Sequence, residues 1–109
     1  MEPVITLENY KDLLPNFYYG YARVHDKSFS SNFKSKVNWD YLSSDAILSE
    51  DFIRKFKNNV NWFYISECQK LSESFLREFQ DKVDWDIIFM KQSLSESFKK
   101  EFQHKLKKD

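Results

Sequence analysis

The sequence predicts an all-α fold, built as a short solenoid-like array of helix-turn-helix repeats of 23 residues. Trp39, Trp62 and Trp85 stand 23 residues apart, and the tripeptide Leu-Ser-Glu recurs at the same interval. The chain contains one glycine and two prolines, which favours helices over a β-sandwich or barrel. Repeats with periods of 20–50 residues are typical of arrays in which each unit buries its apolar face against its neighbours.

Four units can be written in one register: 14–36, 37–59, 60–82 and 83–105. All belong to a single domain of residues 1–109, because a chain of 109 residues fits one domain. The first unit is degenerate, but Phe29 and Phe33 keep the repeated phenylalanine positions. Residues 1–13 are expected to cap the array, with a helix over 5–13, since terminal units must face water. Residues 106–109 are expected to form a basic tail.

Each unit is expected to contain two helices that begin at asparagine, aspartate or serine, the residues preferred as N-caps. The expected N-caps are Asn38, Asn61 and Asp84 for the first helices, and Ser49, Ser72 and Ser95 for the second. The tryptophan and the apolar residue three positions later share one face of the first helix. Phenylalanine pairs at 52/56, 75/79 and 98/102 have the i,i+4 spacing of a core-facing stripe on the second.

A strand–helix unit is the competing interpretation. Residues 37–41 alternate apolar and polar side chains, as a half-buried strand would, and such a unit would resemble a leucine-rich solenoid. The units lack the regular leucines and the asparagine ladder of that fold, so we favour two helices.

In the repeated pattern, a valine is followed by asparagine or aspartate and then by tryptophan, and Leu-Ser-Glu and two phenylalanines come later in the unit. This pattern covers residues 37–105. It resembles a short repeat found in proteins of giant DNA viruses and some phages. The resemblance implies a viral origin and an all-α array, but no shared activity or catalytic residue. Small viral repeat proteins often bind host proteins, so a protein partner, such as a host protein, is the expectation by analogy.

Positions that break the repeat are the candidate partner-binding residues. Large apolar side chains replace aspartate, serine or glutamate at sites one, four and five residues after the tryptophan position. These sites form one helical stripe, turned by about 120° from the core face. Clustered exposed apolar groups mark partner sites. The candidates are Phe17, Tyr21, Phe63, Phe89 and Met90.

Two other interpretations of these five residues stay open: packing of the terminal units on the flanking segments, and contact between copies of the chain. Phe63 belongs to a central unit, so end-capping explains it least well.

No pattern in the sequence indicates catalysis, a metal or a cofactor. His25, His104 and the lone Cys68 do not have zinc-site spacing. The single glycine excludes a phosphate-binding loop and a dinucleotide fingerprint. The repeated glutamates occupy equivalent solvated places, whereas catalytic carboxylates need different environments. We therefore expect a protein that is not an enzyme.

The expected function is that of a non-enzymatic protein-binding module. It would be a viral factor that inhibits or redirects a host protein, such as a defence component, by steric occlusion. One cysteine, no visible signal peptide and no apolar run of membrane length predict a soluble intracellular protein with no membrane contact, in the host cytoplasm if viral.

Two alternative functions are kept. A self-assembling structural protein would stack its open ends. A nucleic-acid-binding accessory protein would use the C-terminal lysines, although the net charge of zero argues against it. Those lysines are Lys99, Lys100, Lys105, Lys107 and Lys108.

Overall fold

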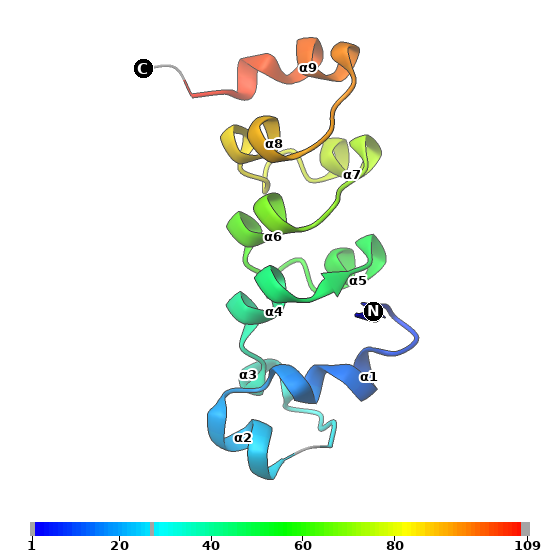
Figure 1. Cartoon of the computed structure of the whole chain (residues 1–109), viewed down its shortest axis with the longest axis vertical. Coiled ribbons are helices and arrows are strands. Elements are labelled where there is room, and N and C mark those ends of the chain that lie inside the picture. The colour runs from blue at the N-terminus through cyan, green and yellow to red at the C-terminus, as the bar shows by residue number, and fades with distance from the viewer. Residues whose placement is uncertain (1, 27, 108–109) are drawn as a thin grey trace.

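The computed structural model describes residues 2–26 and 28–107 of an elongated molecule (Figure 1). Its extents are 49 × 29 × 24 Å and its radius of gyration is 15.4 Å, whereas a compact domain of this length has about 13 Å. The described residues are mostly helical, with one small two-stranded sheet among them, so the predicted all-α class is confirmed. Met1, Lys27, Lys108 and Asp109 lie outside that range, and with them the ends of the expected capping segment and basic tail.

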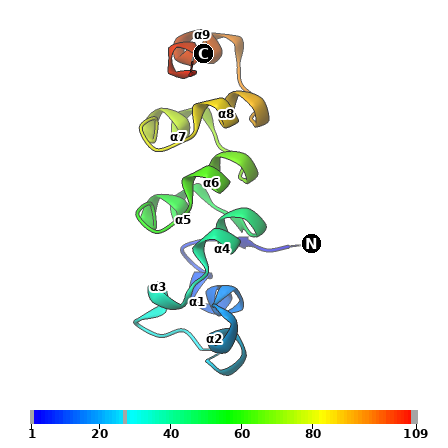
Figure 2. The same cartoon turned by 90° about the vertical axis from the view of Figure 1, so that its left-hand side faces the viewer.

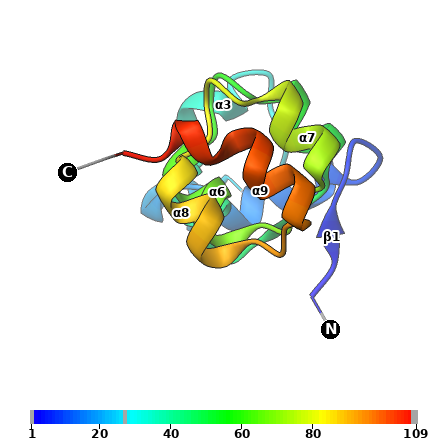
Figure 3. The ribbon, with the colours of Figure 1, turned by 90° about the horizontal axis from the view of Figure 1, so that it is seen from above.

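Six helices follow the 23-residue period in two rows (Figures 1 and 2). The first row contains α4 (Trp39–Asp45), α6 (Trp62–Cys68) and α8 (Trp85–Lys91). The second row contains α5 (Glu50–Lys55), α7 (Glu73–Glu78) and α9 (Glu96–Phe102). The view down the long axis places α8 over α6 (Figure 3). Each helix is only six or seven residues long, so packing between layers has to stabilise it.

The predicted N-caps are confirmed. Each of the six side chains accepts a hydrogen bond from a backbone N–H two or three residues later in the chain. Such a bond satisfies one of the four unpaired donors at a helix start. The start of each repeated helix is therefore encoded locally.

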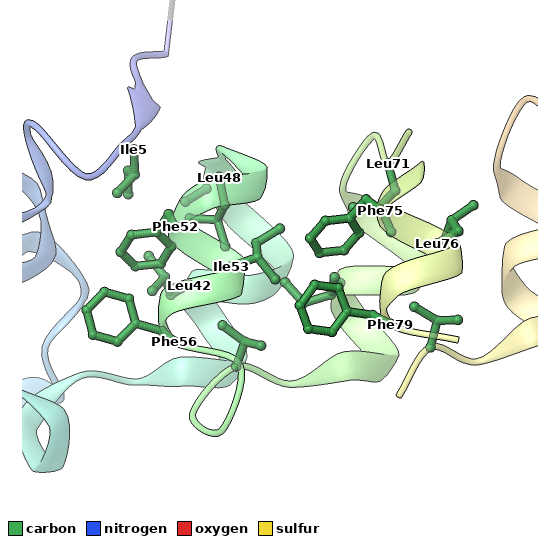
Figure 4. Close-up of a cluster of buried hydrophobic side chains, with 14 of the residues drawn as sticks. Ile5, Leu42, Leu48, Phe52, Ile53, Phe56, Leu71, Phe75, Leu76 and Phe79 are labelled. Carbon is green, nitrogen blue, oxygen red and sulfur yellow. The ribbon is translucent and has the colours of Figure 1, made fainter. Parts of the chain in front are cut away.

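The paired phenylalanines form the centre of each layer. The rings of the pairs 52/56, 75/79 and 98/102 are buried, with centroids 4.7, 4.6 and 4.5 Å apart. Figure 4 shows the first two pairs in consecutive layers, with Ile53 between them. Phe29 and Phe33 keep the same spacing, 4.6 Å, in the degenerate first unit. This repeated geometry makes one continuous core along the molecule.

Each tryptophan anchors the turn that precedes its helix. The indole N–H of Trp39, Trp62 and Trp85 donates to the carbonyl oxygen five residues earlier, at 2.9 Å in all three units. Trp85 is buried, but Trp39 and Trp62 are half-buried at the edge of the core. All three tryptophans therefore pack on the core, Trp85 within it and the other two at its edge.

Glutamine side chains join successive layers. The Oε1 atom of Gln69 accepts the backbone N–H of Leu48 at 3.0 Å. Its Nε2 atom donates to the carbonyl oxygens of Ser43 and Ala46 at 2.9 and 2.7 Å. Gln92 makes the equivalent three bonds one layer later, at 3.2, 3.0 and 2.6 Å. The loop between the two helices of one unit is thus held by a side chain of the next.

The N-terminal segment differs from the expected helix over 5–13. Its residues form β1 (Val4–Ile5), a turn and the short α1 (Tyr10–Leu13). Within the turn, the side chain of Asn9 accepts the N–H of Thr6 at 2.8 Å and donates to the carbonyl of Val4 at 2.9 Å. β1 pairs in parallel with β2 (Ile47–Leu48), so a non-local strand contact replaces the predicted helix.

The first unit keeps the repeated core positions but not the repeated helices. Pro15 stands where Asn38 caps α4, and its ring offers no acceptor to a helix start. The chain instead forms a 3₁₀ turn, η1 (Leu14–Phe17), followed by α2 (Gly20–His25) and α3 (Phe33–Lys36). α2 contains no buried residue among those described, and it lies at the end of the molecule (Figure 1).

The opposite end of the stack is polar. Ile53 and Leu76 are completely buried between layers, whereas Lys99 occupies the equivalent position of α9. The short η2 (Gln103–Lys105) follows α9 and places the last described residues beside α8, where the N–H of Lys107 donates to Asp86 Oδ1 at 3.2 Å. The lysine and this segment therefore close the C-terminal layer.

Candidate protein-binding face

Phe63 is the clearest exposed aromatic residue of the central layers. It follows Trp62 in the first turn of α6, which the Asn61 side chain caps. One residue on a helix turns the side chain by about 100°, so the bond that holds Trp62 inward directs Phe63 away from the core. Phe63 is 46% exposed. Aspartates occupy the equivalent positions of α4 and α8, so no repeated structural role requires phenylalanine here.

Phe63 borders a shallow hollow of about 370 Å³, which we call the lysine hollow. Its other walls are Lys82, Val83, Asp84, Trp85, Asp86, Lys105 and Lys107. Both aspartates already accept backbone N–H groups at 3.2 Å, Asp84 from Ile87 and Asp86 from Lys107. The hollow thus combines one exposed aromatic ring with three ammonium groups.

A second hollow, of about 390 Å³, lies at the start of α4, and we call it the tyrosine hollow. It is lined by Tyr19, Asn38, Asp40, Tyr41, Ser44 and Tyr64. Tyr41 and Tyr64 stand 23 residues apart, two residues after a tryptophan, and therefore about 200° from the tryptophan direction on their helices. The repeat could have identified these two residues. Tyr19 could not have been found, because it belongs to the unit that departs from the repeat.

A third hollow, of about 190 Å³, contains Phe17 and lies between the N-terminal segment and α4. Tyr41 lines both this Phe17 hollow and the tyrosine hollow. The rings of Phe17 and Tyr41 are 5.3 Å apart. The remaining walls include the carboxylates of Glu2 and Asp45.

The three hollows are connected through shared or neighbouring residues: Tyr41 lines two of them, and Phe63 and Tyr64 of α6 line the other pair. We call the three hollows together the binding face. The tyrosine and lysine hollows lie at the N-terminal ends of α4 and α8 respectively. Between them, Asn61 Nδ2 donates to Asp40 Oδ1 at 2.7 Å, and the rings of Phe63 and Tyr64 are 5.4 Å apart. Neighbouring side chains of α6 therefore lie between the two hollows, and Asn61 ties this helix to Asp40 of α4.

The five predicted site residues do not form one cluster. Tyr21 and Met90 are 80% and 69% exposed, on α2 and α8. Phe17 and Phe89 are only partly exposed and pack against the core. Phe89 replaces the buried Ser66 of the preceding unit, and its ring lies 6.3 Å from Trp85. Phe63 and Phe17 line different hollows.

Two of the C-terminal lysines have acidic neighbours. Lys99 lies 3.6 Å from Glu96, and Lys105 lies 3.8 Å from Asp81. Lys108 lies outside the described residues. These neighbours reduce the positive potential that a phosphate backbone would meet at this end.

The remaining reactive groups include the thiol of Cys68. Partial desolvation and the nearby Glu67 carboxylate raise the pKa of the Cys68 thiol, which keeps it protonated at neutral pH. Within residues 2–26 and 28–107, histidine, cysteine and carboxylate side chains form no group of three suited to a metal ion. No helix of this part of the chain has the length and apolar character needed to cross a bilayer.

Comparison with known proteins gives no relative: no protein-family model, curated protein or solved structure matches this chain.

Proposed function

We propose that this chain is a non-enzymatic protein-binding module whose 23-residue units act as a short solenoid-like scaffold for the binding face. The observation that carries the proposal is Phe63, a half-exposed phenylalanine at a position where two other units have aspartate. Exposing an aromatic ring beside ammonium groups has no benefit for the core, but it suits a partner that covers the ring.

The rows of short helices suit this role. Contacts with neighbouring layers, such as the Gln69 and Gln92 bonds, hold each helix pair in place. Residues on the outer side of α4, α6 and α8 can then change without loss of the core. A partner bound there would be blocked sterically from its other ligands. By its resemblance to viral repeats, we propose that the partner is a host protein that the module inhibits or redirects.

Two features of the ends weigh against self-assembly by stacking. Lys99 replaces the buried Ile53 and Leu76 at the C-terminal end, and a layer added there would bury an ammonium group at considerable cost. At the other end of the molecule lies α2, which departs from the repeated helices, so this end offers no copy of the repeated layer for stacking. We therefore propose a module that works as a single copy.

The test is affinity capture from a host-cell lysate with the wild type and with Phe63→Asp. Aspartate is the residue that the equivalent positions 40 and 86 already hold, so this variant should keep the wild-type helical circular dichroism. Tyr21→Ser, which removes an even more exposed aromatic ring outside the three hollows, is the matched control.

A protein retained by the wild type and by Tyr21→Ser, but lost with Phe63→Asp, would support the proposal and assign the face. Equal retention by all three forms would move the site away from Phe63. Capture that weakens steeply with added salt and disappears after nuclease treatment would favour the nucleic-acid alternative.

A further inference from the structure

The charges on the binding face are divided between its two ends, and we infer that its ligand is an extended protein segment of mixed charge. The acidic end of that segment, carrying an apolar side chain, would occupy the lysine hollow, and a basic residue would lie over the tyrosine hollow. This inference rests on the proposed function and specifies the chemistry of the partner.

The lysine hollow suits carboxylates next to an apolar group. Three lysines and two aspartates line it, and Lys105 also lies 3.8 Å from Asp81, so the positive charge that a partner meets comes mainly from Lys82 and Lys107. Asp84 and Asp86 each accept a backbone N–H, whose partial positive charge offsets part of theirs. Lys82 and Lys107 are exposed at the rim, and the Phe63 ring forms an apolar wall. Partner carboxylates would pair with these ammonium groups while an apolar side chain covers the ring.

The other end of the face has the opposite charge. Asp40 is the charged residue of the tyrosine hollow, and Glu2 and Asp45 are those of the neighbouring Phe17 hollow. Three tyrosines line this hollow together with Asp40. A lysine or arginine of a partner would gain a carboxylate and aromatic faces there, the surroundings that favour a cation–π contact.

The spacing of the hollows sets the length of the segment. One hollow lies at the start of α4 and the other at the start of α8, with α6 between them. Packed helices lie roughly 8–10 Å apart, which places the hollows about 16–20 Å from each other. An extended chain covers about 3.3 Å per residue, so about five or six residues would separate the basic residue from the acidic cluster.

This division of charge favours a protein segment over a nucleic acid. A single strand could stack a base on Phe63 and place phosphates on the lysines. Its next phosphates would then approach Asp40, Asp45 and Glu2, where like charges repel. A uniformly anionic ligand would therefore fit only one end of the face.

The test uses random twelve-residue peptides displayed on phage and selected on the full-length chain. Depleting the library on Phe63→Asp first removes peptides that bind elsewhere. The expected pool carries aspartate or glutamate beside an aromatic or aliphatic residue, with a lysine or arginine about five or six positions away. Synthetic peptides from the pool are then titrated against charge variants of the chain.

Changing Lys82, Lys105 and Lys107 together to glutamine should weaken these peptides about tenfold, the combined effect of three exposed ion pairs. The matched control changes Lys70, Lys91 and Lys100, which lie outside the lysine hollow, and should alter binding by less than about twofold. Asp40→Asn should weaken a peptide that carries the basic residue, but not a truncated peptide that lacks it.

A pool without acidic residues, or peptides insensitive to the lysine hollow variant, would overturn the inference. If Phe63-dependent capture of a protein persisted in that case, the binding function would stand and only the partner chemistry would be wrong. If that capture were absent too, the proposed function would also fail. Binding of a twelve-nucleotide uridine strand that requires both Phe63 and the three lysines would replace the inferred segment with a nucleic acid.

Discussion

Replacing Gln69 by methionine should destabilise the protein more than any change of comparable size on its surface. Gln69 is only 4% exposed, and its side chain makes three hydrogen bonds to backbone groups of the preceding unit. Methionine has a similar length and fills a similar space, but it carries neither the carbonyl nor the amide. Gln69→Met would therefore leave the N–H of Leu48 and the carbonyls of Ser43 and Ala46 without this partner.

The magnitude follows from the cost of leaving buried polar groups unpaired. Each unpaired group costs about 1–3 kcal/mol, and a carbonyl costs an amount at the low end of that range. For one N–H and two carbonyls, Gln69→Met should therefore cost about 3–4 kcal/mol. A chain of this length has a total stability of roughly 5–16 kcal/mol, so this is a large fraction. Gln92→Met removes an equivalent set of bonds from a half-buried side chain. Water can replace part of those bonds, so the loss should be about 1–2 kcal/mol.

Urea denaturation of the two variants, followed by circular dichroism, measures this difference in stability. With a slope of about 1–3 kcal/mol per molar urea, Gln69→Met should lower the midpoint by about 2 M and Gln92→Met by less than about 1 M. If the two variants unfolded at the same midpoint, burial would not control the cost. If Gln69→Met unfolded like the wild type, these bonds would not join the layers.

Four further predictions test the core, the face, an ion pair and the closed end. Trp62→Ala should cost about 3 kcal/mol in urea denaturation, at the low end for a tryptophan, because the ring is only half-buried; an unchanged midpoint would refute its packing on the core. Phe63→Asp should change stability by less than about 0.5 kcal/mol in the same assay, and a larger loss would mean that the ring supports the fold. The Arg54 guanidinium donates to the Glu78 carboxylate at 2.8 and 2.9 Å and lowers the pKa of that carboxyl. This pair therefore stabilises the fold at a pH above the unfolded-state pKa of Glu78, and its contribution is lost as the pH falls through the lower folded-state pKa. Arg54→Gln should therefore reduce the difference in urea midpoint between pH 7 and pH 2.5, and an unchanged difference would count against the pair. Lys99→Leu should make the mass measured by sedimentation rise with concentration, because it restores the apolar residue of the interior layers at an open end; a constant mass would show that the end is closed by other residues.

The sequence was sufficient wherever the interactions are local. The N-cap at Asn61 and the phenylalanine pair at 75/79 depend on residues two to four positions apart, so a 23-residue period was enough to predict the helix starts and the core positions. The same reasoning identified Phe63 as exposed, because its position holds aspartate in other units.

Tertiary structure decided the features that join distant segments. β1 pairs with β2 across more than 40 residues of chain, and no local pattern in residues 4–5 signals that partner. The position of Phe89 is buried in the other units as well, because Ser43 and Ser66 lie under the next unit and accept its backbone N–H groups; a serine in the sequence gives no sign of that burial. The hollows of the binding face also form between units, so their walls combine residues that the repeat places far apart in sequence. A repeated sequence therefore specifies each layer through short-range bonds, whereas the contacts between layers and at the two ends determine which side chains a partner can reach.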